Sequence, residues 1–182
     1  GRRPRFQRRD LACLQCHQHP VTENVPGWFV RSIYPERSGM PAFRGTGFVS
    51  NHRSPLKERW GGWYVTGTHG SQRHMGNAFV TEGAQTAELD DRESQNLTSL
   101  GSRINPDEYL TPHSDIVALL VVEHQARAIN LMTNAGWEVR KALQQRPPAA
   151  LQKTLQTTCE PLLAYLLMAD ETPLTETISG TS

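Results

Sequence analysis

Two cysteines and a histidine stand close together near the start of the chain, in the run Cys13-Leu14-Gln15-Cys16-His17. Thiols with this spacing lie one helical turn apart, so both sulfurs can form thioether bonds with the two vinyl groups of one porphyrin. The imidazole that follows is then carried directly beneath the metal. The run therefore predicts covalent attachment of one haem, haem c, through Cys13 and Cys16, with His17 as the proximal iron ligand.

The same residue types could bind zinc instead, with His19 as a further ligand, because zinc accepts thiolate and imidazole. Zinc sites usually gather a second pair of ligands at a distance, and the only other cysteine, Cys159, lies among leucines. We interpret Cys159 as a small buried apolar residue. A thioredoxin-like redox pair needs a following helix, and Pro20 would soon end one. Haem attachment is thus the stronger hypothesis.

The Cys-x-x-Cys-His run resembles the haem-attachment motif of c-type cytochromes. Residues 39–43, Gly-Met-Pro-Ala-Phe, resemble the Met-Pro loop that carries the distal methionine in many of them. The chain is also similar to a group of largely uncharacterised haem-motif proteins of environmental bacteria. The segments that carry this similarity are Val25-Pro26-Gly27, Arg-Trp-Gly-Gly-Trp-Tyr-Val-Thr-Gly-Thr-His-Gly at residues 59–70, His74-Met75-Gly76-Asn77 and Glu123-His124-Gln125. The resemblance implies a cytochrome c-like protein with one covalent haem, whose chain continues past residue 182.

The iron needs a ligand on the face opposite His17, and the sequence leaves several candidates open. His69 is our first choice, because the glycines on either side of it would let backbone and porphyrin approach closely. The other candidates with an imidazole or thioether donor are His74, Met75, His124 and Met40. A lone histidine on the apolar side of a helix, as His124 would be, is more often a hydrogen-bonded core residue.

Aromatic and basic side chains near these candidates could complete a haem pocket. Trp60 and Trp63 would supply flat apolar walls for a porphyrin, or would form the core of a sheet. Arg59 and Arg73 could pair with the haem propionates, since a guanidinium binds a carboxylate bidentately.

The first half of the sequence is interrupted by glycine, proline and aromatic residues, while the second half has helical periodicity, which together predict an α+β fold. We expect a small antiparallel sheet, bearing the haem, with strands at residues 28–34, 48–49, 62–66 and 78–81, and then an exposed connection over residues 82–105. A long helix from Thr111-Pro112 to residue 146 and a second over residues 150–169 would form an antiparallel pair. The tail over residues 170–182 should have no element of its own.

We therefore expect a β-rich haem-attachment region at residues 1–105 and a helical hairpin at residues 106–182, packed together as one unit. In the long helix, a polar stripe is expected to face solvent, formed by Glu123, Arg127, Asn130, Asn134, Glu138 and Lys141. The opposite, buried face should consist of Val117, Leu120, Ala128 and Leu131.

The formal net charge is +1, from 19 Lys and Arg against 18 Asp and Glu, so no overall field steers the chain to nucleic acid. No run approaches the roughly 18 apolar residues that a membrane span needs. The arginines of the first ten residues are expected to form a solvated basic arm. Because the sequence begins at Gly1 without methionine, we interpret its start as a processed or truncated end.

A covalent, six-coordinate haem predicts an electron carrier rather than a catalyst. Thioether attachment takes place outside the cytoplasm, so a periplasmic or extracytoplasmic location is expected. The partner would be a redox protein or a larger membrane-associated complex. The alternatives are a haem-based sensor or gas-binding module, and the haem subunit of a larger oxidoreductase, both of which would use an open or labile distal site.

Overall fold

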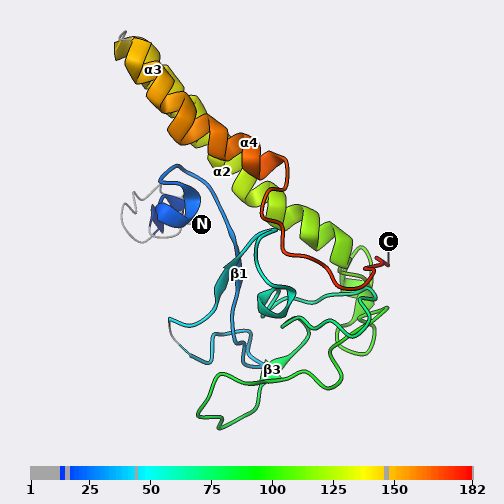
Figure 1. Cartoon of the computed structure of the whole chain (residues 1–182). Coiled ribbons are helices and arrows are strands. Elements are labelled where there is room, and N and C mark those ends of the chain that lie inside the picture. The colour runs from blue at the N-terminus through cyan, green and yellow to red at the C-terminus, as the bar shows by residue number, and fades with distance from the viewer. Residues whose placement is uncertain (1–12, 15–16, 44, 146–147, 182) are drawn as a thin grey trace, which may run out of the picture. The chain divides into compact units, whose positions relative to one another are not determined.

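The computed structural model describes residues 13–14, 17–43, 45–145 and 148–181 (Figure 1). Small antiparallel ladders and helices occur together in it, which confirms the α+β class. The chain divides into two compact units. The first holds the described residues up to Phe29 together with Ala126–Leu167, and the second holds Val30–Gln125 together with the residues from Met168 onward. The boundary that we expected at residue 105 stays a prediction.

Over the described residues, the strands form two separate two-stranded ladders rather than one sheet. Strand β1 (Val30–Ser32) pairs antiparallel with β2 (Phe48–Ser50), and β3 (Phe79–Val80) pairs antiparallel with β4 (Leu89–Asp90). Three of the expected strands are therefore present: β1 and β3 are shorter than expected, and β2 is one residue longer. Strand β4 lies in the stretch that we expected to be an exposed connection, so that expectation was wrong at these residues.

Residues 62–66 do not form the expected strand, because the backbone around them turns. Trp60 and Gly62 have φ values of 66° and 88°, which a continuous strand does not contain. The side chain of Asn77 takes the place of a neighbouring strand: its Oδ1 accepts from the Val65 N–H at 2.8 Å, and its Nδ2 donates to the Val65 carbonyl oxygen at 2.8 Å. The backbone of Val65 is thus satisfied without a ladder.

The long helix α2 spans Ile116–Gln145, so it begins four residues later than a cap at Thr111 predicted. Asp115 caps it, since its Oδ1 accepts from the backbone N–H groups of Val117 and Ala118 at 2.9 Å each. Ser114, just before this cap, is hydrogen-bonded to Thr66 in the second unit: the Thr66 N–H donates to the Ser114 carbonyl oxygen at 2.7 Å. Short 3-10 turns occur at Pro20–Thr22 (η1), Leu56–Glu58 (η2) and Pro106–Glu108 (η3).

In the part of the chain that the structure describes, α2 is the one long helix, so the expected pair of long helices is not found there. The segment after it consists of α3 (Pro148–Thr154), a π-helical turn η4 (Leu155–Cys159) and α4 (Glu160–Leu166). These pieces lie along the part of α2 in the same unit (Figure 1). One contact is the Arg127 guanidinium over the Tyr165 ring, 5.6 Å from its centre. Within the described residues, no helix is long and apolar enough to cross a membrane.

The faces of α2 differ in part from the expected pattern. Glu123 and Asn130 are each 1% exposed, while Val117 is 43% exposed, so these positions were wrongly assigned. Lys141 of the expected polar stripe is exposed, as predicted. Ala128 is buried as expected. The chain packed against α2 is mostly irregular, and its buried peptide groups need hydrogen-bond partners that side chains must supply. Polar residues on the inner face of α2 meet that need.

The core of the second unit is a cluster of Leu56, Trp60, Val65 and Ile116. Residues of the C-terminal tail close over it: Ile178 packs against the cluster, and Thr68 and Ser179 exchange two backbone hydrogen bonds of 2.9 Å. The tail is therefore fixed at these positions, although it contains only an isolated bridge and no regular element.

Replacing Asn77 with alanine should destabilise the protein by about 3 kcal/mol or more, because it leaves the buried Val65 backbone groups and the Ser94 carbonyl oxygen without their partner. Denaturant unfolding of the purified protein measures this. Asn24→Ala is the matched control, since the φ of Asn24, 58°, is similar to that of Asn77, but the Asn24 side chain is exposed. Equal losses in both variants would show that backbone conformation, and not the amide, is what matters.

Candidate functional site

The attachment run begins in helical conformation, at Cys13 and Leu14. The Gln18 N–H donates to the Leu14 carbonyl oxygen at 2.9 Å, as in a helical turn. The Cys13 thiol is free and exposed. Cys16 lies outside the described residues. Cys13 is therefore accessible to a reaction partner, and it stands one turn before His17.

The imidazole of His17 is exposed and has its orientation fixed by one contact. Its Nδ1 lies 3.1 Å from the Gly27 carbonyl oxygen, and the Gly27 N–H donates to the His17 carbonyl oxygen at 2.9 Å. A carbonyl oxygen has no proton to give, so this contact selects the tautomer with the proton on Nδ1. The lone pair is then on Nε2, which is the arrangement of most histidines that ligate metals.

The loop between His17 and Gly27 is held closed from within. Thr22 is fully buried, and its hydroxyl donates to the Val25 carbonyl oxygen at 2.9 Å and accepts from the His19 N–H at 3.1 Å. Pro20 opens the 3-10 turn η1, as expected from the helix-ending effect of proline. These contacts hold the Gly27 carbonyl oxygen in position beside the His17 ring that it orients.

Helix α2 fixes the other side of this loop. The Asn130 Nδ2 donates to the Trp28 carbonyl oxygen at 2.7 Å, and the Asn134 Nδ2 donates to the Glu23 carbonyl oxygen at 3.0 Å. Gly27 is required at its position, because an added Cβ would lie 2.1 Å from the Asn130 Oδ1. The glycine of the Val25-Pro26-Gly27 motif is therefore explained by close packing against Asn130.

The second unit contains a pair of buried histidines, His69 and His74, which were our leading distal candidates. Their ring centres are 4.7 Å apart in an edge-to-face arrangement, and the Trp60 ring lies 5.5 Å from that of His74. His69 and His74 are 0% and 3% exposed. The sequence offered these two residues as alternative distal ligands, and that choice stays a prediction.

Each histidine of the pair has one ring nitrogen bound to the backbone. The Asn96 N–H donates to His69 Nε2 at 3.1 Å, and the Gly76 N–H donates to His74 Nδ1 at 3.0 Å. The proton of neutral His69 is then on Nδ1, a buried atom for which the described residues offer no hydrogen-bond partner. Burial lowers the pKa of His69. Burial, and secondarily the proximity of His69, lowers the pKa of His74 to about 3, so both rings are neutral at physiological pH.

The remaining distal candidates differ in their surroundings. Met40 is 63% exposed in its loop, whereas Met75 is buried with its Sδ 3.5 Å from the Ser32 hydroxyl. His124 is half-buried and its Nδ1 lies 2.9 Å from the Nδ1 of His52. His52 Nε2 donates to the Ala169 carbonyl oxygen at 3.2 Å, which leaves its Nδ1 to accept from His124.

The aromatic and basic candidates are engaged in the second unit. Trp60 belongs to the core cluster, and the Trp63 Nε1 donates to the Arg31 carbonyl oxygen at 2.9 Å. Arg73 pairs with Asp91, its Nε lying 2.9 Å from the carboxylate. Arg59 is buried against Glu123, and its Nη2 donates to the carbonyl oxygens of His52 and Ser54.

The ion pair between Arg59 and Glu123 was missed by sequence reasoning, which placed Glu123 in solvent. The two side chains are 2% and 1% exposed, and Arg59 Nη1 lies 3.1 Å from Glu123 Oε2. Burial raises the pKa of Glu123 to about 7, although the Arg59 charge opposes the rise. Their separation in the sequence hides the pair, and no local spacing could have indicated it.

The described residues contain no group of three or more His, Cys, Asp or Glu side chains that could hold a metal ion by themselves. Comparisons with models of protein families, with curated proteins and with solved structures found no match for this chain. The interpretation of the site therefore depends on its chemistry.

Replacing His74 with asparagine should reduce the acid sensitivity of the fold. The unfolded histidine takes up a proton below about pH 6.5 and the folded one only near pH 3, so stability is lost as the pH falls through this window. At about pH 4.5 the loss due to His74 is about 3 kcal/mol. Asparagine keeps an acceptor near the Gly76 N–H and does not titrate.

The measurement is the free energy of unfolding of both proteins at about pH 7.5 and about pH 4.5. Part of the acid loss remains in the variant, since burial also lowers the pKa of His69 and of His52. His19→Asn serves as the control because His19 is exposed. An unchanged pH dependence in His74→Asn would contradict the assignment.

Proposed function

We propose that the chain is a monohaem c-type cytochrome that transfers electrons outside the cytoplasm. Haem c would be bound through Cys13 and Cys16, and His17 would be the proximal ligand. The observation that supports this best is the contact of His17 Nδ1 with the Gly27 carbonyl oxygen at 3.1 Å, which presents Nε2 for a metal.

The described residues of the attachment run fit this cofactor. A thioether needs an accessible thiol, and the Cys13 thiol is free and exposed. Axial ligation needs an imidazole of fixed orientation, and His17 has one. When bound, haem supplies a one-electron couple whose potential depends on its axial ligands and surroundings.

The chain's own residues would tune that couple through His17. A hydrogen bond from Nδ1 to a carbonyl oxygen makes the imidazole a stronger electron donor, which favours the oxidised metal and lowers the potential. The Gly27 carbonyl can do this only if the loop stays closed, and Thr22 holds the loop from within while Asn130 binds it next to Gly27, at Trp28.

The distal ligand belongs to the proposal as a choice among His69, His74, Met75, His124 and Met40. A histidine there would give a lower potential than a methionine. The partner would be a redox protein or a larger membrane-associated complex, in the periplasm or elsewhere outside the cytoplasm. These assignments follow from the attachment chemistry.

Cys13→Ser and Cys16→Ser should each abolish or strongly reduce two-thioether haem attachment, because each removes one of the two sulfurs. The protein is made in a host with the cytochrome c maturation machinery, and mass spectrometry and the reduced visible spectrum measure bound haem. Cys159→Ser is the matched control, since it removes the third cysteine and should leave attachment unchanged. A colourless wild-type protein of unmodified mass would refute the proposal.

The spectrum of the haem protein also separates a carrier from a sensor. Low-spin bands that do not change with carbon monoxide are expected for a six-coordinate carrier. Rapid binding of carbon monoxide would instead support a gas-binding module or an open catalytic site. Replacing the five distal candidates one at a time by alanine should convert one variant alone to a high-spin spectrum.

Gly27→Ala should keep the covalent haem and raise its midpoint potential, because the new Cβ would collide with Asn130 and displace the carbonyl that strengthens His17. A tenfold change in relative affinity for the two oxidation states corresponds to roughly 60 mV, which redox titration resolves. Gly101→Ala is the control, since a Cβ there meets nothing closer than 3.6 Å. An unchanged potential would show that the carbonyl contact does not tune the iron.

A further inference from the structure

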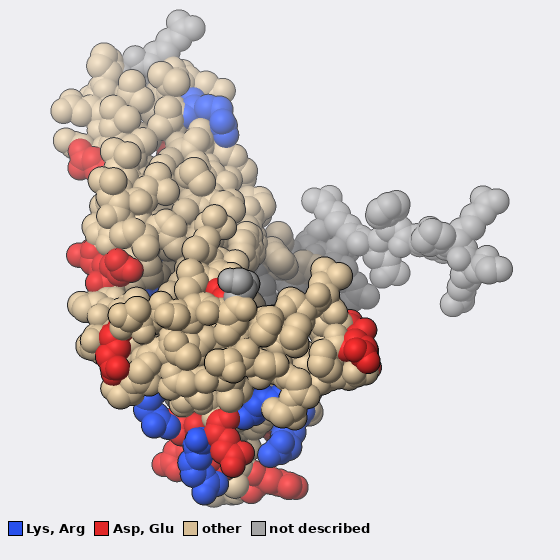
Figure 2. Space-filling view, turned by 90° about the vertical axis from the view of Figure 1, so that its right-hand side faces the viewer, with Lys and Arg blue, Asp and Glu red and all other residues tan. Residues whose placement is uncertain are grey.

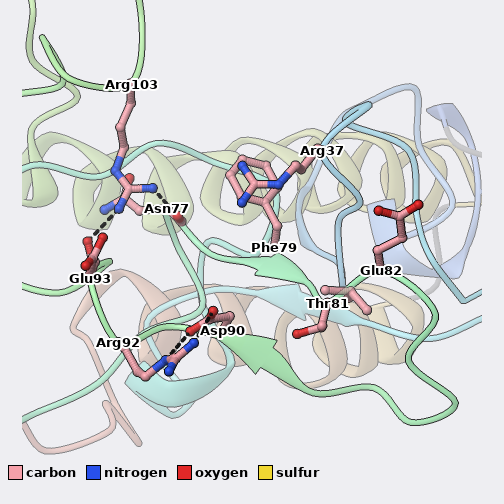
Figure 3. A pocket seen from close by; sticks show the side chains of 10 residues that line it. Arg37, Asn77, Phe79, Thr81, Glu82, Asp90, Arg92, Glu93 and Arg103 are labelled. Atoms are coloured by element: carbon pink, nitrogen blue, oxygen red, sulfur yellow. Dashed lines mark hydrogen bonds and ion pairs between the residues drawn. The ribbon is translucent and has the colours of Figure 1, made fainter.

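Charged side chains of both signs crowd together at one end of the face seen in Figure 2. Such a mixture lines a cavity of about 580 Å³ beside the β3–β4 ladder of the second unit. Figure 3 shows three arginines around it, Arg37, Arg92 and Arg103, with the Phe79 ring among them. A cavity of this size lies within the range of small-molecule sites.

Arg103 is held rigidly without a charged partner. Its Nη1 donates to the Asn77 carbonyl oxygen at 2.8 Å and its Nη2 donates to the Glu93 carbonyl oxygen at 2.5 Å. These acceptors are main-chain groups, so they orient the guanidinium but do not neutralise it. Three of its five N–H groups remain for another acceptor.

Arg37 is the second cation of the cavity that forms no salt bridge with a described carboxylate, although its charge also acts on Asp90. Its guanidinium lies over the Phe79 ring, 5.5 Å from the ring centre. Among the described residues, no side-chain carboxylate oxygen of Asp or Glu lies within 4.0 Å of the Arg37 or Arg103 guanidinium nitrogens. The aromatic contact fixes the group in place and leaves its N–H edge available.

Arg92 differs from these two because the chain already supplies its carboxylate. Asp90 accepts from Arg92 Nε and Nη2 at 2.8 Å each, and these hydrogen bonds lower the pKa of Asp90 to about 2. Glu82 also lines the cavity, on the side opposite Arg103 in Figure 3. Glu93 lines the cavity as well, so its wall carries three arginines and three carboxylates. Among the described residues, Arg37 and Arg103 are the two of these arginines that form no salt bridge.

We propose that this cavity binds a small organic oxyanion, with its carboxylate or phosphate group between Arg37 and Arg103 and its body along Phe79. The guanidinium forks match the geometry of such groups, and the orientation of Arg103 is fixed before binding. This site lies within the second unit and does not depend on the haem proposal.

The test is calorimetric titration of the purified full chain with citrate and, separately, with pyrophosphate, at constant ionic strength. Saturable binding of at least one of them is expected, accompanied by amide shifts at Phe79 and Arg103 in NMR spectra. Preference for citrate would identify a carboxylate site, and preference for pyrophosphate a phosphate site. Absence of saturable binding of both at about 10 mM would overturn the proposal.

Arg37→Gln and Arg103→Gln should each weaken binding roughly tenfold or more, as expected for loss of a charge-assisted hydrogen-bonded pair. Arg31→Gln is the matched control: Arg31 is exposed, binds only the Thr46 carbonyl oxygen in the described structure and does not line the cavity. It should change affinity less than twofold.

Arg103→Gln also removes two bonds to the main chain, so its fold is checked by the thermal midpoint. Arg37→Gln breaks no such bond and decides the question if Arg103→Gln is unstable. Equal weakening by Arg31→Gln and Arg37→Gln would show only a general charge effect and would overturn the site.

Discussion

The buried ion pair of Arg59 and Glu123 is the interaction on which the second unit depends most. Both side chains are almost completely excluded from water, and removal of either would leave a buried charge without its partner. Arg59 also binds the carbonyl oxygens of His52 and Ser54, so the pair ties an irregular loop to α2. The ladders of this unit contain few residue pairs, and side-chain contacts of this kind replace the regular hydrogen bonds of a larger sheet.

The same principle operates in the first unit, through a different part of α2. Asn130 and Asn134 bind the backbone of the loop that ends at Gly27, and that loop orients His17. Helix α2 therefore presents polar groups to the protein interior along much of its length, while apolar residues such as Val117 and Ile129 are left partly exposed. Polar side chains on the inner face of α2 form hydrogen bonds with particular backbone groups. Because hydrogen bonds are directional, they set the positions of the functional loops more specifically than apolar packing would.

Sequence reasoning identified the local features and missed the long-range ones. The Cys-x-x-Cys-His run, the turn at Pro20 and the approximate places of β1, β2 and β3 follow from neighbouring residues. The helix start was misplaced because Asp115 is a better cap than Thr111, with two N–H groups in reach. The exposed stripe and the strand at residues 62–66 failed because Glu123 and Asn77 bond to groups far away in the sequence, and periodicity carries no information about such partners.

The C-terminal residues give this architecture a particular order of assembly. Thr172 donates to the His52 carbonyl oxygen and Ser71 binds Glu176, contacts that join positions more than a hundred residues apart. Closing such a loop costs entropy before any contact is gained, which slows folding. On the ribosome, residues 30–125 emerge well before this closing segment. Until Ile178 is synthesised, the core cluster around Trp60 lacks one of the apolar side chains that pack against it. This apolar surface of the nascent unit is therefore exposed to water during that time.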